Sequence, residues 1–234
     1  MARNKRDEEL TPPTRRDALR MFGLTALAGL APAASLGALF DTASAEAQDG
    51  PTRAALFERF RDGRIAVAPR AVHGAPGARI IGQVDAEFRD TIAALLAFGA
   101  YRSTFALWLR RVRVLSRARG RARLYADVEV IRNTPSTWVE LDVVIRGDAD
   151  GTHRVELSRV RGDLATFHVV WQFISTPGRM HTLASLDVAV APHISLPTST
   201  LQASNLDVAR LAFASIRRAA KSHGQRRLTQ GPAT

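Results

Sequence analysis

Residues 138–160 read WVELDVVIRGDADGTHRVELSRV, and in them apolar and polar side chains alternate with a period of two. This period is typical of a β-strand with one buried face. The glycines and aspartates of residues 147–151, GDADG, interrupt the alternation and favour a tight turn. Two strands joined by so short a connection pair antiparallel, so this stretch predicts a β-hairpin. Its inward positions are Val139, Leu141, Val143, Ile145, Val155 and Leu157.

The same alternation continues in both directions from this hairpin. The predicted strands cover residues 78–84, 112–117, 124–130, 138–145, 154–160, 167–173 and 183–190. Turn residues separate the later runs at 119–120, 133–136, 147–151, 161–163 and 176–178. Strands joined by such short turns predict an antiparallel meander.

Helical periodicity appears before and after this meander. A long amphipathic helix is predicted after Pro197, with apolar residues at spacings of three and four: Leu206, Ala209, Phe213, Ile216 and Ala220. Two short helical segments are predicted between the first two strands. The first carries Phe88, Ile92, Leu95 and Leu96 on one face, and the second carries Tyr101, Phe105 and Trp108. A further short helix is predicted over residues 52–61, followed by a Gly/Pro/Ala-rich loop.

These elements predict an α+β fold with a curved, seven-stranded antiparallel sheet, two short helices and a long carboxyl-terminal helix. One face of such a sheet needs cover, and a single long helix laid across it supplies that cover. One helix does not fill the concavity, so an apolar pocket commonly remains between helix and sheet.

The first 45 residues have the layout of a twin-arginine export signal. Arg15 and Arg16 precede the weakly apolar run 21–40, which is followed by the small residues 43–45, ASA. The alternatives are a transmembrane anchor, a buried helix and a chance Arg-Arg pair in an arginine-rich protein. The Ala/Gly-rich composition argues against the anchor, Pro32 argues against the buried helix, and the joint order of the three parts argues against chance. We therefore expect cleavage after Ala45 and a periplasmic or secreted protein. The expected segments are a signal at 1–45, an extension or linker at 46–77, one domain at 78–222 and a disordered tail at 223–234.

Composition excludes some chemistry and leaves other partners open. The chain has no cysteine, which excludes disulfides, thiolate catalysis and cysteine-ligated metal centres. Its 33 Lys and Arg against 22 Asp and Glu give a formal net charge of +11. The arginines are scattered rather than clustered, so nucleic acid is not the expected partner. A peripheral contact with anionic membrane lipids is the more plausible use of this charge.

Three stretches carry a resemblance to a known superfamily. They are the segment 101–108, YRSTFALW; the aromatic strand 167–173, FHVVWQF; and the loop 191–197, APHISLP, before the last helix. In this order the chain resembles the START-like helix-grip superfamily (START/Bet v 1-like), including its polyketide cyclase and coenzyme-Q-binding branches, over residues 78–222. The segment 84–87, VDAE, departs from the Pro-containing start that the family's first helix usually has. The resemblance implies a protein that holds a hydrophobic small molecule between sheet and helix.

No pattern in the chain predicts a catalytic centre, a metal or a cofactor. The six histidines lack metal-ligand spacing on a helix, and neither a Gly-rich phosphate loop nor a Gly-x-Ser-x-Gly elbow is present. His168 and Gln172 alternate with the aromatic face of their strand, so they are expected to point away from the helix. With the opposite facing they would be polar groups inside the cavity. The residues predicted to bind the ligand are Phe167, Val169, Trp171, Phe173, Trp108 and Phe213.

Three functional hypotheses follow from these observations. The first is an exported, non-catalytic protein that binds a lipid, a quinone or another hydrophobic molecule. The second is a cyclase or dehydratase of the same fold, with His168 as the first acid–base candidate. The third is an interaction module without a ligand.

Overall fold

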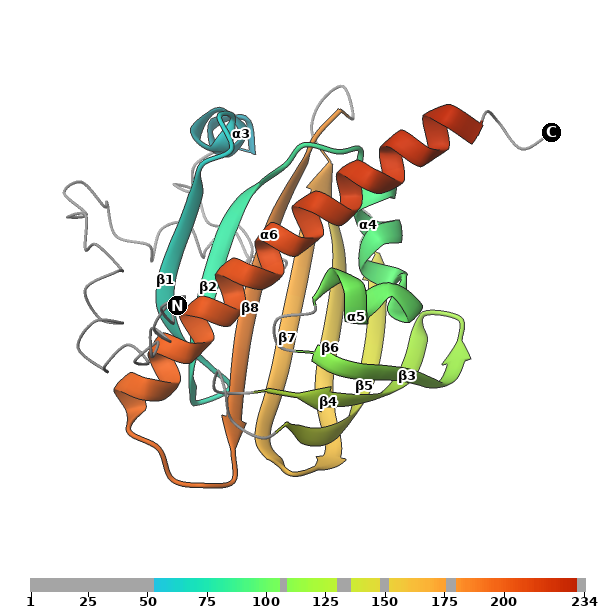
Figure 1. Ribbon diagram of the computed structural model, residues 1–234. Coiled ribbons are helices and arrows are strands. Elements are labelled where there is room, and N and C mark those ends of the chain that lie inside the picture. Colours follow the sequence, from blue (N-terminus) through green and yellow to red (C-terminus); the bar gives the residue numbers. More distant parts are fainter. Residues whose placement is uncertain (1–52, 106–108, 130–135, 148–151, 176–179, 231–234) are drawn as a thin grey trace, which may run out of the picture. The chain divides into compact units, whose positions relative to one another are not determined.

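The computed structural model describes residues 53–105, 109–129, 136–147, 152–175 and 180–230. In this part of the chain an antiparallel sheet carries one long helix across one of its faces (Figure 1). The architecture is α+β, as the sequence predicted. The predicted signal at 1–45, most of the turns at 133–136 and 147–151, and the whole turn at 176–178 lie outside the described residues.

The sheet contains eight described strands in the order β1-β2-β8-β7-β6-β5-β4-β3. Strand β2 therefore pairs with the last strand, β8, and the other pairs are hairpin neighbours. The strands are β1 (Ile65–Val72), β2 (Ala75–Val84), β3 (Leu109–Ala118), β4 (Arg121–Val128), β5 (Thr137–Gly147), β6 (Thr152–Gly162), β7 (Leu164–Ser175) and β8 (Thr182–Pro192). The helices are α3 (Arg53–Phe60), α4 (Phe88–Leu96), η1 (Phe98–Ala100), α5 (Tyr101–Thr104) and α6 (Thr198–Gln230).

The sheet has one strand more than the predicted seven. The additional strand is β1, which lies inside the segment 46–77 that was predicted to be an extension or linker. Strand β1 pairs antiparallel with β2, and His73 and Gly74, both with positive φ, make the turn between them. Pro69 is tolerated because β1 is an edge strand, which has no neighbouring strand on its other side to accept a backbone hydrogen bond. The ordered domain thus begins before residue 78. The predicted helix at 52–61 is present as α3.

The short helices and the tail also differ from the prediction. Three short segments, α4, η1 and α5, replace the predicted two. Helix α6 continues to Gln230, so the predicted disordered tail at 223–234 is wrong as far as the structure describes it. Arg227 holds this end of the helix, since it donates two hydrogen bonds to Asp90 (3.1 and 3.0 Å) and lies 2.9 Å from Glu87. These partners are far away in the sequence, so no local pattern predicts the contact.

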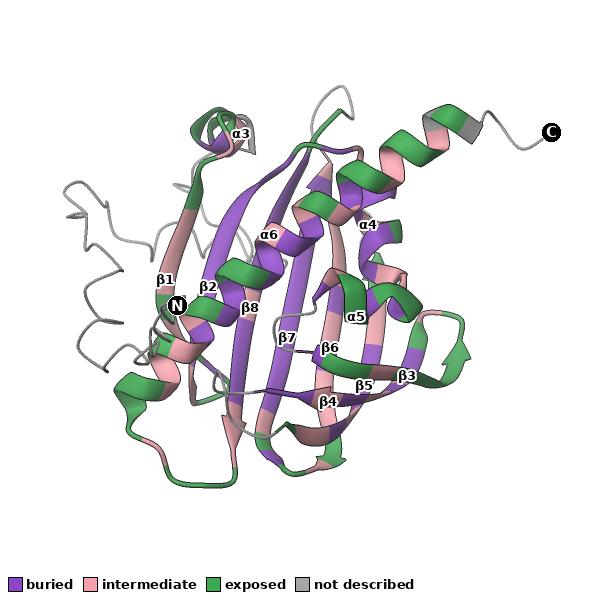
Figure 2. Cartoon of the chain, viewed as in Figure 1, coloured by how far each residue is buried: buried purple, intermediate pink, exposed green. Residues whose placement is uncertain are grey.

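The two faces of the sheet have different cover. We call the face under α6 the helix face and the opposite one the outer face. Buried residues run along β2, β8 and β7 and along the side of α6 that meets them (Figure 2). A second, smaller apolar cluster lies on the outer face, where α3 packs against the sheet: Leu56, Phe60, Ile81, Ile174 and Leu183.

A buried amide fixes the first half of α6 to the sheet. The side chain of Asn205 accepts a hydrogen bond from the Val190 amide (3.0 Å) and donates to the carbonyls of Pro76 (2.9 Å) and Val190 (3.2 Å). One side chain therefore ties the helix to both β2 and β8. Sliding the helix along the sheet would break these buried hydrogen bonds, so Asn205 also favours a single position of α6 on the sheet.

Candidate functional site: an apolar cavity under the long helix

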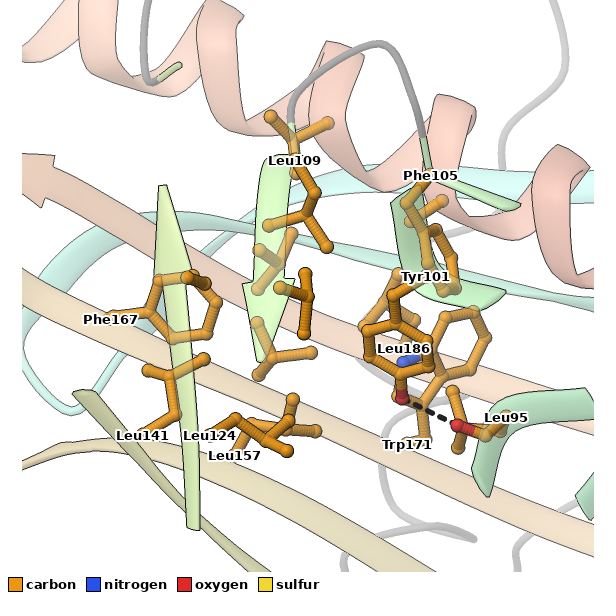
Figure 3. A pocket seen from close by; sticks show the side chains of 16 residues that line it. Leu95, Tyr101, Phe105, Leu109, Leu124, Leu141, Leu157, Phe167, Trp171 and Leu186 are labelled. Atoms are coloured by element: carbon orange, nitrogen blue, oxygen red, sulfur yellow. Dashed lines mark hydrogen bonds between the residues drawn. The ribbon is translucent and has the colours of Figure 1, made fainter. Parts of the chain in front are cut away.

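An apolar cavity lies between the helix face of the sheet, the α4–α5 segment and α6 (Figure 3). The described residues that line it are almost all aliphatic or aromatic. They are Leu95, Tyr101, Phe105, Leu109, Val112, Leu124, Ala126, Leu141, Leu157, Phe167, Val169, Trp171, Leu186, Val188, Val208 and Ala212. Among them, the Tyr101 hydroxyl and the Trp171 indole supply the only side-chain polar groups.

Strand alternation positions the wall of this cavity. In β7, Phe167, Val169 and Trp171 are two residues apart, so all three side chains point to the helix face. The neighbouring strand β8 adds Leu186 opposite Trp171 and Val188 opposite Val169. Helix α6 closes the space with Val208 and Ala212, which are one turn apart.

The cavity measures about 30 Å³ in this conformation. That volume accommodates only a few water-sized molecules, and a space with so apolar a lining stays dry. An acyl chain or a quinone ring is much larger. A ligand of that class therefore enters only if the lining side chains or α6 move outward.

Tyr101 is the one ionisable residue among the described residues of the lining. Its hydroxyl donates a hydrogen bond to the carbonyl of Leu95, and its ring packs edge-on against Phe98 and Phe105. Burial raises the pKa of Tyr101 above its ordinary value, so the phenol stays neutral at physiological pH. It can donate a hydrogen bond to a ligand, and it does not act as a base there.

The structure brings five of the six predicted ligand residues together, and Trp108 lies outside the described residues. Phe167, Val169 and Trp171 line the cavity. Phe173 and Phe213 are buried beside it, with ring centroids 5.7 and 6.0 Å from that of Trp171. Contact of these side chains with a ligand stays a prediction.

The deeper wall of the cavity was not predicted from the sequence. Leu124, Leu141 and Leu157 come from the central strands β4, β5 and β6. Their inward facing followed from the alternation of each strand. These three leucines surround one cavity because of the order of the strands and the position of α6. The alternation within a strand predicts neither of these.

His168 and Gln172 lie on the outer face, away from the cavity, although both are buried. The rings of His168 and His73 are 3.9 Å apart, and Ser185 donates a hydrogen bond to Gln172 (3.3 Å). Burial, and secondarily the nearby His73, lowers the pKa of His168. An acid–base role for His168 inside the cavity is therefore excluded by its facing.

Within the described residues, two further features are absent. No group of three or more His, Asp or Glu side chains is arranged to hold a metal ion. No helix in the same part of the chain combines the length and the apolar character that crossing a membrane requires.

Comparison with known proteins gives a likeness of structure alone. No family model matches this chain, and no match to it was found among curated proteins. A STAR-related lipid transfer protein from Xanthomonas axonopodis matches with a TM-score of 0.52 and 17% identity, over 69% of this chain and 93% of its own. Human STARD10 matches with a TM-score of 0.57 and 14% identity, over 80% and 88%. Human StAR-related lipid transfer protein 5 matches with a TM-score of 0.55 and 12% identity, over 72% and 94%. At such identities the likeness concerns the fold, and this chain has a START-like helix-grip fold.

Proposed function

We propose that this protein binds a hydrophobic small molecule, of the lipid or quinone class, in the cavity between the sheet and α6. The observation that carries the proposal is a cavity beneath α6 whose described lining offers apolar surface and a single hydroxyl group. Structures that share the fold are named as lipid transfer proteins, which supports the same class of ligand.

Burial of apolar surface would supply the affinity. Each Å² of apolar ligand area removed from water contributes about 25 cal/mol, and the outward movement of the wall opposes this gain. The Tyr101 hydroxyl would orient a carbonyl or quinone oxygen by exchanging its bond to Leu95 for one to the ligand. A cyclase or dehydratase would have to use the same hydroxyl, since no described lining residue is a base.

A basic hairpin supports a peripheral contact with anionic lipid. Strands β3 and β4 and the turn between them carry seven arginines over residues 110–123, and Val114 and Leu115 are exposed among these arginines. In the described part of the structure, Arg113, Arg119 and Arg121 form no ion pair. Each arginine near a negatively charged leaflet contributes about 1 kcal/mol of attraction. The hairpin would bring the protein to the membrane that contains its ligand.

Export through the twin-arginine pathway to the periplasm or beyond is part of the proposal. Replacing the pair with Arg15→Lys and Arg16→Lys is expected to retain the protein in the cytoplasm, because the export signal is read at these guanidinium groups. The matched control is Arg3→Lys with Arg6→Lys, which is expected to leave export intact. Cell fractionation and the intact mass of the exported form measure both the location and cleavage after Ala45. Equal export of the two variants would refute the signal.

Tryptophan quenching tests the ligand proposal directly. One variant, Trp108→Phe/Trp138→Phe, keeps only Trp171, which lines the cavity. The matched variant, Trp108→Phe/Trp171→Phe, keeps only Trp138, which stacks on Tyr125 on the outer face. Methyl 9,10-dibromostearate, a neutral quencher delivered from cyclodextrin, is expected to quench Trp171 saturably and Trp138 little, because bromine quenches only at short range. Quenching that is equal in both proteins, or that never saturates, would exclude binding in this cavity.

A further inference from the structure

A second cavity, of about 270 Å³, lies between the α4–α5 segment and the carboxyl-terminal half of α6. It has no lining residue in common with the apolar cavity, although the same segment borders both. Leu95 and Tyr101 turn toward the apolar cavity, and Ala94, Ala97 and Ala100 turn toward the second one. We call this second cavity the basic groove, defined by Ser215, Arg218, Ser222, His223 and Arg226 on its α6 wall.

The groove arises from a polar stripe where two helices would ordinarily pack. Positions 215, 218, 222 and 226 recur at spacings of three and four, so they share one side of α6. This side faces a segment whose alanines are too small to reach across. Helix packing usually fills such a space with apolar side chains. Here the helix presents serines and arginines, and the space stays open.

The electrostatics of the groove favour an anion. Its described lining contains Arg218, His223 and Arg226 and no carboxylate. The nearby carboxylates of Glu87 and Asp90 are already paired with Arg227. Neither Arg218 nor Arg226 forms an ion pair with any described residue. The guanidinium groups are therefore available to a ligand.

Hydroxyl groups supplement this positive charge. Ser103, Thr104, Ser215 and Ser222 line the groove from both walls. Ser103 and Ser222 donate hydrogen bonds to the carbonyls of Ala100 (2.8 Å) and Arg218 (3.0 Å), so these two hydroxyls donate to a ligand only by exchanging those bonds. Ser215 is buried, and Arg218 donates a hydrogen bond to its oxygen (3.2 Å), which holds the guanidinium beside the groove. Arg218 and Arg226 are two helical turns apart, about 12 Å along the axis. Their long side chains can converge on an oxyanion held between them.

We propose that the basic groove binds a phosphate-class oxyanion. Arginine forms bidentate, charge-assisted hydrogen bonds with phosphate oxygens, and serine and threonine hydroxyls donate to the same oxygens. The volume accommodates a phosphate together with a small substituent such as glycerol. The phosphate can come from a lipid headgroup or from a soluble compound, because both present the same oxygens. The proposal does not depend on a ligand in the apolar cavity.

Calorimetric titration of the full exported chain with two probes at constant ionic strength tests the site. The probes are inorganic phosphate and dihexanoyl phosphatidic acid below its micelle concentration. Saturable binding of at least one probe is expected. Arg218→Gln/Arg226→Gln is expected to weaken it at least about tenfold, since each lost charge-assisted bond contributes about a factor of ten. The matched control, Arg210→Gln/Lys221→Gln, removes the same charge from exposed positions of α6 outside the groove and is expected to change Kd less than about twofold.

The outcomes separate the sources and the alternatives. Equal affinity for the two probes identifies soluble phosphate compounds as the ligands, and tighter binding of the phosphatidic acid identifies a lipid headgroup. Absence of saturable binding for both probes overturns the proposal, and so does equal weakening in the two double variants, which would show attraction by net charge alone. Circular dichroism confirms that the variants fold. The neutral dibromostearate ester reports on the apolar cavity separately, so either proposal can fail without the other.

Discussion

Phe213→Ala is expected to lower the free energy of unfolding by about 3–5 kcal/mol, the range for a fully buried aromatic residue cut back to alanine. Phe213 is 1% exposed and joins α6 to the sheet. Its ring stacks on Trp171 at 6.0 Å, and the guanidinium of Arg217 lies 5.0 Å from its centroid. Truncation removes these contacts and leaves a void between helix and sheet. Urea unfolding of the purified protein measures the loss.

The control for this substitution is Leu211→Ala, on the exposed side of the same helix, which is expected to change stability by no more than about 0.5 kcal/mol. The void beside Trp171 also adjoins the apolar cavity, because Trp171 lines that cavity. A small apolar compound such as benzene is therefore expected to raise the melting temperature of Phe213→Ala more than that of the wild-type protein. Equal losses in the two alanine variants would contradict the role of Phe213 in docking α6.

Asp187→Ala is expected to cost about 3–5 kcal/mol of stability, because it leaves a buried guanidinium without its carboxylate. Arg79 and Asp187 are cross-strand partners in the β2–β8 pair on the outer face. The Arg79 side chain is 6% exposed and donates to both carboxylate oxygens, at 2.6 and 2.5 Å. Arg70 is 3.9 Å from the same carboxylate, so Asp187→Ala also removes this anion from a second guanidinium. Denaturant unfolding at neutral pH measures the loss.

Two further variants separate burial from simple loss of charge. Asp142→Ala removes a carboxylate that is 33% exposed and 3.7 Å from Arg123 on the outer face, and its expected cost is below about 1 kcal/mol. The double variant Arg79→Leu/Asp187→Leu replaces the buried pair with apolar side chains and is expected to recover most of the stability. The explanation is wrong if Asp187→Ala lowers stability no more than Asp142→Ala does. It is also wrong if the double variant is as unstable as Asp187→Ala, because loss of the carboxylate beside the buried guanidinium would then not be the cause.

The proposed function depends on movement of the cavity wall. The described conformation leaves about 30 Å³ beneath α6, so a lipid or quinone must displace side chains that now touch one another. Close-packed interiors resist such displacement unless the ligand returns the lost contacts. The single-tryptophan comparison measures this directly, because Trp171 reports entry into the cavity and Trp138 reports binding on the outer face.

Strand periodicity predicted most of the sheet, and it failed where a strand had no periodic signal. Strand β1 contains Pro69, and most of its side chains are half-buried or exposed, so its sequence reads as a loop. The segment forms a strand because its backbone pairs with β2. The continuation of α6 to Gln230 was not predicted for a similar reason. Arg227 near its end is held by a hydrogen bond to Asp90, which is 137 residues away in the sequence.

Local sequence pattern is enough to predict which side chains share a face. Phe167, Val169 and Trp171 point the same way because backbone geometry alternates within a single strand, and the stripe of α6 follows likewise from 3.6 residues per turn. How closely those faces approach one another depends on the packing of elements that are distant in the sequence. The narrow apolar cavity and the open basic groove are gaps between elements far apart in the chain. Their sizes depend on the distance between packed surfaces, and local backbone periodicity carries no information about that distance.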